Sequence, residues 1–347
     1  MKILIIANAR WKDGMSGSDN IYMMFLKYWD IDQEDSRIMD MMKIDYKPFW
    51  LCYFGRIVRS IWEALSMKNE FDFVYSSSDF MMDVFPAWIL KKRGKVRKWV
   101  AGFYMVAPKQ NRIYYFTQKL TKHLITKFAD VVIVTNPTLY KEFPNKVKTW
   151  INGGIDISKT GFSNEKKIYD AVFVGRIHPT KGIDELIDIW EKVVEKKPEA
   201  RLAIIGDGDL GMDYIREKIG ACYKRGNRLN IEVFGHLVDE RFDVFKKSKV
   251  VLYPTPKKYD HFSMSPIEAM ACGCPMMCFD LKSVARMDPK STIAAYDGDY
   301  EYFADNIMLM IESNSYKALQ DEAREWALKF EERKEALRVE NFLKEVL

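Results

Sequence analysis

Short, solidly apolar runs recur along the whole chain and are separated by stretches with helical periodicity. Residues 3–6 and 131–134 consist entirely of leucine, isoleucine or valine. A strand without polar residues is buried on both faces, as in a parallel sheet that helices cover on both sides. Between two such runs, the apolar residues of 183–194 recur at the i, i+3 and i+4 spacing of an amphipathic helix. This alternation predicts an α/β fold of the doubly wound type.

The expected strands form two series that are separated by a turn-rich, polar stretch. The length of 347 residues also favours two domains, at roughly 150 residues per domain. We expect a first domain at 1–155, a linker at 156–168, a second domain at 169–325, and a C-terminal segment at 326–347 that packs back toward the first domain. The expected strands are 2–8, 72–77, 97–103, 131–135 and 149–152, followed by 171–175, 201–206, 230–235, 250–254, 275–279 and 292–296.

The composition excludes several classes of protein. Charged residues make up 30% of the chain, and the net charge of +5 is too small to indicate nucleic acid by itself. Five scattered cysteines in a chain of this length do not form a disulfide scaffold and suit a reducing cytosol. No run reaches the ~18 apolar residues of a transmembrane helix, and the apolar start is too short for a secretory signal. We therefore expect a cytoplasmic protein.

Two loops that follow expected strands carry groups suited to binding. In the first, Arg176 and Lys181 lie on either side of an expected helix start near Gly182, where cations and free backbone amides can hold a diphosphate. In the second, Asp260 precedes a helix for which Ser265 is the expected cap, and Glu268, eight residues after Asp260, falls in the expected first turn. The alternatives are solvated cations in the first loop and an ordinary capped helix in the second.

Together the two loops resemble those of the retaining glycosyltransferases of family 4, which have the GT-B fold. That family carries a Gly-Arg…Lys-Gly loop and, downstream, two acids separated by seven residues and followed by Ala-Met-Ala-x-Gly-x-Pro. Here the acids are Asp260 and Glu268, and residues 269–275 fit the rest of the pattern. Supporting motifs occur in the family's order at 152–156, 205–208 and 234–235. The resemblance implies two Rossmann-like domains that face a central cleft, an acceptor-binding first domain and a nucleotide-sugar-binding second domain.

The resemblance also implies roles for individual residues. Arg176 and Lys181 would bind the diphosphate, Glu268 the ribose and Asp260 the donor sugar. These four are the expected catalytic set, and no metal or other cofactor is implied, because the nucleotide sugar is a substrate. The expected donor-binding residues are Gly14, Gly17, Arg176, Lys181, Gly206, Gly235, His261, Phe262, Ser263 and Glu268. The expected reaction transfers a hexosyl group from a UDP-sugar, or alternatively a GDP-sugar, to a glycan or lipid-linked acceptor with retention of configuration.

The chain departs from the family pattern at three places. Asp260 stands where the family has glutamate as its first acid, and His261 and Ser263 stand where it has two glycines. These differences leave the identity of the transferred sugar open. Many family members have a histidine after a central strand of the first domain, but none occurs after the strand at 97–103. Asp79 follows another strand of this domain and is a candidate to bind the acceptor hydroxyl, the alternative being a helix cap.

Positive charge is concentrated between residues 88 and 150. This block contains fourteen lysines and arginines and two acids, for a net charge of +12, so the rest of the chain carries −7. Aromatic residues cluster nearby, at 49–54, at Trp62 and at 114–116. Basic and aromatic residues together suit an anionic membrane surface, which leads to the hypothesis of peripheral attachment to its inner face. The alternative is a solvated helical face with the aromatics in the core, and no recognised module favours nucleic acid.

Three other interpretations are open. Gly206, Gly208 and Gly211 match Gly-x-Gly-x-x-Gly after a strand, and Glu232 lies on a later strand, as in an NAD(P)-dependent oxidoreductase. The thiols of 272–278 could bind a metal, but no fourth ligand is near, so buried small residues are expected instead. Finally, the chain could bind a sugar nucleotide or a partner without turnover.

Overall fold

A computed structural model of the chain shows two compact units. Unit 1 comprises residues 1–154 and 332–347, and unit 2 comprises residues 155–331. The structure describes residues 2–7, 17–31, 37–40, 49–107, 112–135, 137–151, 153–162, 166–208, 210–224, 226, 228–259, 263–282 and 290–346.

Unit 1 contains a parallel sheet with the strand order β2-β1-β3-β4-β5-β6. The strands are β1 (Ile3–Ala7), β2 (Arg37–Asp40), β3 (Phe71–Ser76), β4 (Val96–Phe103), β5 (Val131–Val134) and β6 (Val147–Trp150). Every residue of β1 and β5 is buried, as their apolar runs predict. The edge strand β2 was not predicted, because its four residues begin and end with charged side chains and resemble a loop.

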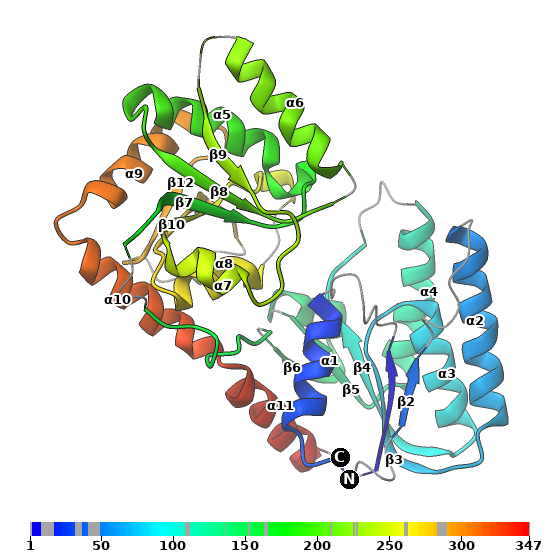
Figure 1. Ribbon diagram of the computed structural model, residues 1–347. Coiled ribbons are helices and arrows are strands. Elements are labelled where there is room, and N and C mark those ends of the chain that lie inside the picture. Colours follow the sequence, from blue (N-terminus) through cyan, green and yellow to red (C-terminus); the bar gives the residue numbers. More distant parts are fainter. Residues whose placement is uncertain are drawn as a thin grey trace. The chain divides into compact units, whose positions relative to one another are not determined.

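Helices cover both faces of this sheet (Figure 1). The helices are α1 (Gly17–Tyr28), α2 (Phe49–Ser66), α3 (Met81–Lys92), α4 (Arg112–Phe128) and α11 (Glu332–Val346), with a 3₁₀ turn η2 (Pro137–Glu142). Helices α2, α3 and α4 cover one face, over a core that includes Trp99 and Phe103. Helices α1 and α11 cover the other face, over a core that includes Phe25 and Tyr75.

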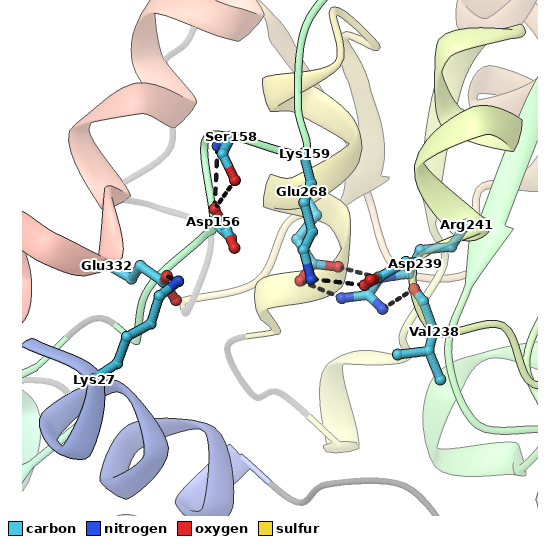
Figure 2. Close-up of polar contacts among 9 residues, drawn as sticks. All are labelled: Lys27, Asp156, Ser158, Lys159, Val238, Asp239, Arg241, Glu268 and Glu332. Carbon is cyan, nitrogen blue, oxygen red and sulfur yellow. Dashed lines mark hydrogen bonds and ion pairs between the residues drawn. The ribbon is translucent and has the colours of Figure 1, made fainter.

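The C-terminal helix α11 is built into unit 1 by polar contacts as well as by packing. The Trp29 indole donates a hydrogen bond to the carbonyl of Ala336 at 2.8 Å, and the backbone N–H of Asp30 donates to Glu340 at 2.9 Å. Glu332 pairs with Lys27 of α1 (Figure 2). Residues 326–331, expected to belong to the returning segment, are instead part of unit 2, where Trp326 and Phe330 join the core and Phe330 accepts a backbone hydrogen bond from Ile155.

Unit 2 contains a second parallel sheet, with the order β12-β11-β10-β7-β8-β9. Its strands are β7 (Tyr169–Val174), β8 (Arg201–Ile205), β9 (Asn230–Val233), β10 (Ser248–Tyr253), β11 (Met276–Phe279) and β12 (Thr292–Ala295). All six coincide with expected strands to within two residues at each end, because each is a short apolar run flanked by turn or charged residues.

The second sheet is also covered on both faces (Figure 1). Its elements are η3 (Pro179–Lys181), α5 (Ile183–Lys196), α6 (Gly211–Lys224), α7 (Arg241–Lys246), η4 (Lys257–Tyr259), α8 (Met264–Ala271), α9 (Tyr300–Glu312), α10 (Tyr316–Ala327) and η5 (Leu328–Phe330). The apolar residues of α5 are buried as their periodicity predicts, with Ile183, Leu186 and Trp190 in one core. In the described part of the chain, no helix is both long and apolar enough to span a bilayer.

Candidate functional site

The strand order of unit 2 reverses between β7 and β10. These strands are neighbours, but the chain leaves β7 toward β8 on one side and β10 toward β11 on the other. The loops that follow the two strands therefore diverge above the sheet, and ligands of doubly wound proteins bind at such a switch point. The two loops that the sequence selects, after residues 174 and 253, both begin there.

Gly182 brings these two loops into direct contact. Its backbone is left-handed, at φ 77° and ψ 34°, and it joins the turn η3 to helix α5. A Cβ atom at this position would lie 1.9 Å from the carbonyl oxygen of Pro254, which directly follows β10. Because only glycine fits this conformation and this spacing, the loop after β7 and the start of α5 are held against the end of β10.

The two cations of the first loop lie beside the same helix start. The imidazole of His178 caps the turn η3 by accepting a hydrogen bond from the N–H of Thr180 at 3.2 Å, and Pro179 occupies its first position. This turn presents Lys181 next to the N-terminus of α5. Burial, reinforced by the charge of the exposed Arg176, lowers the pKa of Lys181 to about 8. A nearby anion would favour the charged ammonium and so offset both effects, which makes this a place that suits a phosphate.

Two further loops are tied to the first by backbone contacts between glycines. Gly206 follows β8, and its N–H donates a hydrogen bond to the carbonyl of Gly235 after β9 at 2.7 Å. A Cβ on Gly206 would lie 1.9 Å from the carbonyl oxygen of Gly175, which follows β7. The carboxyl ends of three adjacent strands are thus fixed relative to one another, and the predicted donor-binding residues Gly206 and Gly235 are brought together.

Glu268 lies on α8, the helix that follows β10, but not at the expected position in the helix. The helix begins at Met264 with Ser263 at its N-cap, so the expectation that Ser265 caps the helix and Glu268 falls in its first turn is wrong. The physical reason is that Pro266 is tolerated within a first turn, whose N–H groups need no partner in the helix. The predicted residue Ser263 is therefore at the N-cap, although its side chain makes no capping hydrogen bond.

Arg241, at the start of α7, holds the carboxylate of Glu268 at two points (Figure 2). Its Nε lies 2.9 Å from Oε2 of Glu268, and its Nη2 lies 2.9 Å from Oε1. Arg241 also donates to the carbonyl of Val238 and lies over the ring of Phe242, 4.7 Å from its centroid. The sequence analysis did not identify Arg241, since no local motif connects it to Glu268.

Thr255 is a second residue that sequence reasoning missed. It lies in the loop after β10, next to the contact between Gly182 and Pro254. Its side chain is fully buried, and its Oγ1 has no hydrogen-bond partner among the residues that the structure describes. Buried hydroxyls are normally paired, so this one, at a switch point, is a candidate to contact a ligand group.

Of the residues predicted for the donor site, some lie outside the described residues, and the others belong to described loops and helices. Asp260, His261, Phe262 and Gly14 lie outside the described residues, and Gly17 is the first residue of α1. Arg176, Lys181, Gly206, Gly235, Ser263 and Glu268 all belong to unit 2 and lie in or after the loops that follow β7 to β10.

Unit 1 has its own switch point, between β1 and β3, and Asp79 lies in the loop that follows β3. Asp79 is buried, and its Oδ2 accepts hydrogen bonds from Gln118 Nε2 at 2.8 Å and Tyr114 OH at 3.3 Å. Burial raises the pKa of this carboxyl, although both hydrogen bonds oppose the rise. The N-cap of the following helix is Phe80, so Asp79 is not the helix cap that was the alternative interpretation.

Cys272, Cys274 and Cys278 are free and buried, as expected of small packing residues. Burial raises the pKa of Cys272 to about 11 and that of Cys274 to about 12, which disfavours the thiolate that metal binding requires. Glu232, the acid of the dinucleotide-binding alternative, accepts a hydrogen bond from Tyr169 at 2.7 Å. Tyr169 is the first residue of β7, so this carboxylate points away from the carboxyl ends of the strands.

Comparisons with known proteins agree with the fold. Residues 169–313 match the family model described as glycosyl transferases group 1. An uncharacterized glycosyltransferase of Methanocaldococcus jannaschii is 32% identical over 118 residues, which are 34% of this chain and 28% of that protein. The chain thus spans little more than a quarter of the length of this curated relative.

Two solved structures are similar over nearly the whole chain. Sucrose-phosphate synthase from Thermosynechococcus elongatus has a TM-score of 0.79 at 16% identity and covers 99% of this chain and 98% of its own. HepE from Anabaena, solved in complex with UDP, has a TM-score of 0.74 at 16% identity and covers 99% of this chain and all of its own. The expected GT-B fold and the resemblance to glycosyltransferases are confirmed.

Proposed function

We propose that this chain, whose residues 169–313 match the family model of glycosyl transferases group 1, is a hexosyltransferase that uses a nucleotide-sugar donor. The observation that carries the proposal is the position of Arg176 and Lys181 at the switch point between β7 and β10. Two cations and the N-terminus of α5 there form a place for the diphosphate of such a donor. The family match covers the loops that hold these residues.

We propose that the same two cations also assist the chemistry. When the bond from the sugar to the diphosphate breaks, negative charge develops on the leaving phosphate, and Arg176 and Lys181 stabilise that charge. In this proposal the two side chains serve the purpose that a metal ion serves in other transferases, and no cofactor is required. Asp260 holds the donor sugar, and the sugar is transferred with retention of configuration, as the resemblance implies.

In the proposal, Glu268 binds the ribose hydroxyls of the nucleotide, and UDP is the preferred nucleotide. A carboxylate has about four acceptor positions on its two oxygens, so the pairing with Arg241 leaves positions for two hydroxyls. UDP is favoured over GDP because HepE, which shares the fold, was solved with UDP. Gly206 and Gly235, joined by a hydrogen bond, would line the base pocket.

For the acceptor we propose a glycan or a lipid-linked molecule bound by unit 1. Asp79 is buried at the switch point of the sheet, where its carboxylate can accept a hydrogen bond from an acceptor hydroxyl. The basic segment at 88–150 would attach the protein to an anionic membrane surface, where a lipid-linked acceptor would be available.

The proposal is tested by nucleotide-sugar binding and turnover in the presence of a metal chelator. Thermal stabilisation by UDP-, GDP- and ADP-sugars is compared between wild type, Lys181→Ala and Glu268→Ala, and nucleotide release is followed. We expect one nucleotide class, UDP, to stabilise wild type but neither variant, with slow release of free nucleotide. Binding without release, even with acceptors present, would support a non-catalytic protein, and tight NAD(P) binding would support an oxidoreductase.

A further inference from the structure

Helix α2 exposes a row of apolar side chains along its outward side. Leu51, Phe54, Val58, Trp62 and Leu65 follow one another at spacings of three or four residues, and all are exposed, Phe54 to 60% and Trp62 to 67%. The opposite side of the same helix is buried against the sheet. An ordinary surface helix has one apolar side, toward the core, and a polar side toward water, so α2 has a second apolar side that the folding of unit 1 does not use.

Helix α4 has an exposed apolar row of the same kind, with cations beside it. Ile113 and Phe116 are exposed to 79% and 64%, and Leu120 continues the row. Lys119 and Lys127 of the same helix are exposed, and the ammonium of Lys119 lies 4.7 Å from the ring centroid of Tyr115. The helix carries four lysine or arginine residues and no acid.

The two rows lie on the same side of unit 1. Helices α2, α3 and α4 cover one face of the sheet, with α3 between the other two (Figure 1). The outward sides of α2 and α4 therefore face the same solvent region. We call this surface, formed by the exposed residues of α2 and α4, the α2–α4 face.

We infer that the α2–α4 face docks unit 1 onto an anionic lipid bilayer, with Phe54, Trp62 and Phe116 entering the headgroup region. Aromatic side chains prefer the boundary between headgroups and acyl chains, and lysines beside them attract anionic lipid. A second copy of this chain is disfavoured as the partner of the α2–α4 face, because pairing two such faces would bring the lysines of α4 close to one another. An anionic bilayer supplies the complementary charge.

The same helix links this face to the candidate acceptor site. On the inward side of α4, Tyr114 and Gln118 hydrogen-bond to Asp79, while Ile113 and Phe116 point outward. The N-terminal ends of α2 and α4 lie at the carboxyl edge of the sheet, because both helices follow parallel strands. This part of the inference rests on the proposed function: docking by the α2–α4 face would keep Asp79 near the headgroup of a lipid-linked acceptor.

Flotation of the full chain with vesicles tests the docking. The probes are vesicles of phosphatidylcholine alone and of phosphatidylcholine with 30% phosphatidylglycerol (about the charge density that anionic leaflets present). We expect binding to the anionic vesicles only, weakened by high salt. The double variant Phe54→Gln/Trp62→Gln should bind at least ~10-fold more weakly, and Lys119→Gln/Lys127→Gln should lose most of the salt-sensitive part.

The matched control is Leu309→Gln, which changes a side chain on α9 of unit 2 that is exposed to the same 67% as Trp62. It should float like wild type, and all variants should keep the wild-type melting temperature. Absence of flotation, equal flotation of the Phe54→Gln/Trp62→Gln variant, or a dimer in solution that this variant dissociates would overturn the inference. Lys181→Ala should float normally, and the Phe54→Gln/Trp62→Gln variant should bind UDP normally, so failure of the proposed donor site is distinguishable from failure of docking.

Discussion

Arg241 and Glu268 form a side-on ion pair in which each oxygen of the carboxylate is 2.9 Å from a different guanidinium nitrogen. Both side chains are largely buried, and the arginine is itself held by the carbonyl of Val238 and by the ring of Phe242. A two-point pair fixes the plane of the carboxylate as well as its position. In the proposed donor site, Arg241 is thus a positioning residue for the group that binds the ribose.

Replacement of Arg241 tests that role. We expect Arg241→Gln to weaken UDP binding about 10-fold, the size of a lost charge-assisted hydrogen bond, because Glu268 is no longer oriented. Arg241→Lys should bind UDP almost as weakly as Arg241→Gln, since an ammonium cannot make the planar two-point contact. Calorimetric titration with UDP measures both variants. Unchanged UDP binding would mean that Arg241 does not orient Glu268 for the ribose. Tighter UDP binding would mean that Arg241 competes with the ribose for Glu268.

UDP affinity should depend on pH through Lys181. The pKa of Lys181 is about 8 in the free protein, so its charge is present below pH 8 and is lost as the pH rises above it. A diphosphate needs the charged form, and the dissociation constant should therefore rise up to ~10-fold per pH unit above pH 8. Lys181→Arg keeps its charge and should bind UDP with a flat profile over the same range. A profile that is the same in both proteins would assign the titration to another group.

Gly182→Ala should destabilise the protein and abolish nucleotide binding. The added Cβ would meet the carbonyl of Pro254 at 1.9 Å, and the φ of 77° is itself strained for alanine. We expect a loss of at least ~2 kcal/mol in the free energy of unfolding, measured by denaturant titration. The control is Gly220→Ala in helix α6, where an added Cβ has open space. This variant should raise the free energy of unfolding by about 0.5–1 kcal/mol. Wild-type stability of Gly182→Ala would contradict the close contact of the two loops.

Thr255→Val should separate stability from donor binding. Removing a buried hydroxyl that has no partner among the described residues should stabilise the free protein by about 1 kcal/mol. If the hydroxyl serves the donor, UDP-sugar affinity should fall at the same time. Thr292→Val is the matched control, because the hydroxyl of Thr292, at the amino end of β12, likewise has no partner among the described residues and its loss should change stability alone. If both variants bind UDP-sugar with the same affinity, Thr255 does not contact the donor.

Asp79→Asn should lower turnover while leaving UDP affinity unchanged. The pKa of Asp79 is raised by burial, so the folded protein holds its charged form unfavourably at neutral pH. The variant should therefore be at least as stable as wild type at pH 7, and the difference should shrink as the pH falls through the raised pKa and Asp79 is protonated. Transfer to acceptor should decrease ~100-fold, the usual effect of a positioned carboxylate. Full transfer activity with the same stability change would make Asp79 a structural residue only.

The apolar runs of the sequence determined most of the fold. Strands such as Val131–Val134 and helices such as α5 follow from local periodicity, because a strand buried on both faces and an amphipathic helix each require a particular order of side chains. The same reasoning located the loops of Arg176 and Lys181, since a cationic loop between a strand and a helix is visible in the sequence itself. It missed β2, whose polar ends resemble a loop.

The tertiary structure alone decided which of these groups meet. Arg241 pairs with Glu268 across 27 residues of sequence, and Gln118 reaches Asp79 across 39. Gly182 meets Pro254 because β7 and β10 are neighbours in the sheet, although two other strands, β8 and β9, lie between them along the chain. The packing of helices across a sheet sets these contacts. It also sets how far the pKa of Lys181 is lowered and how much of Trp62 is exposed. Local periodicity specifies which side of a helix is apolar, and the order in which strands pair decides what that side faces.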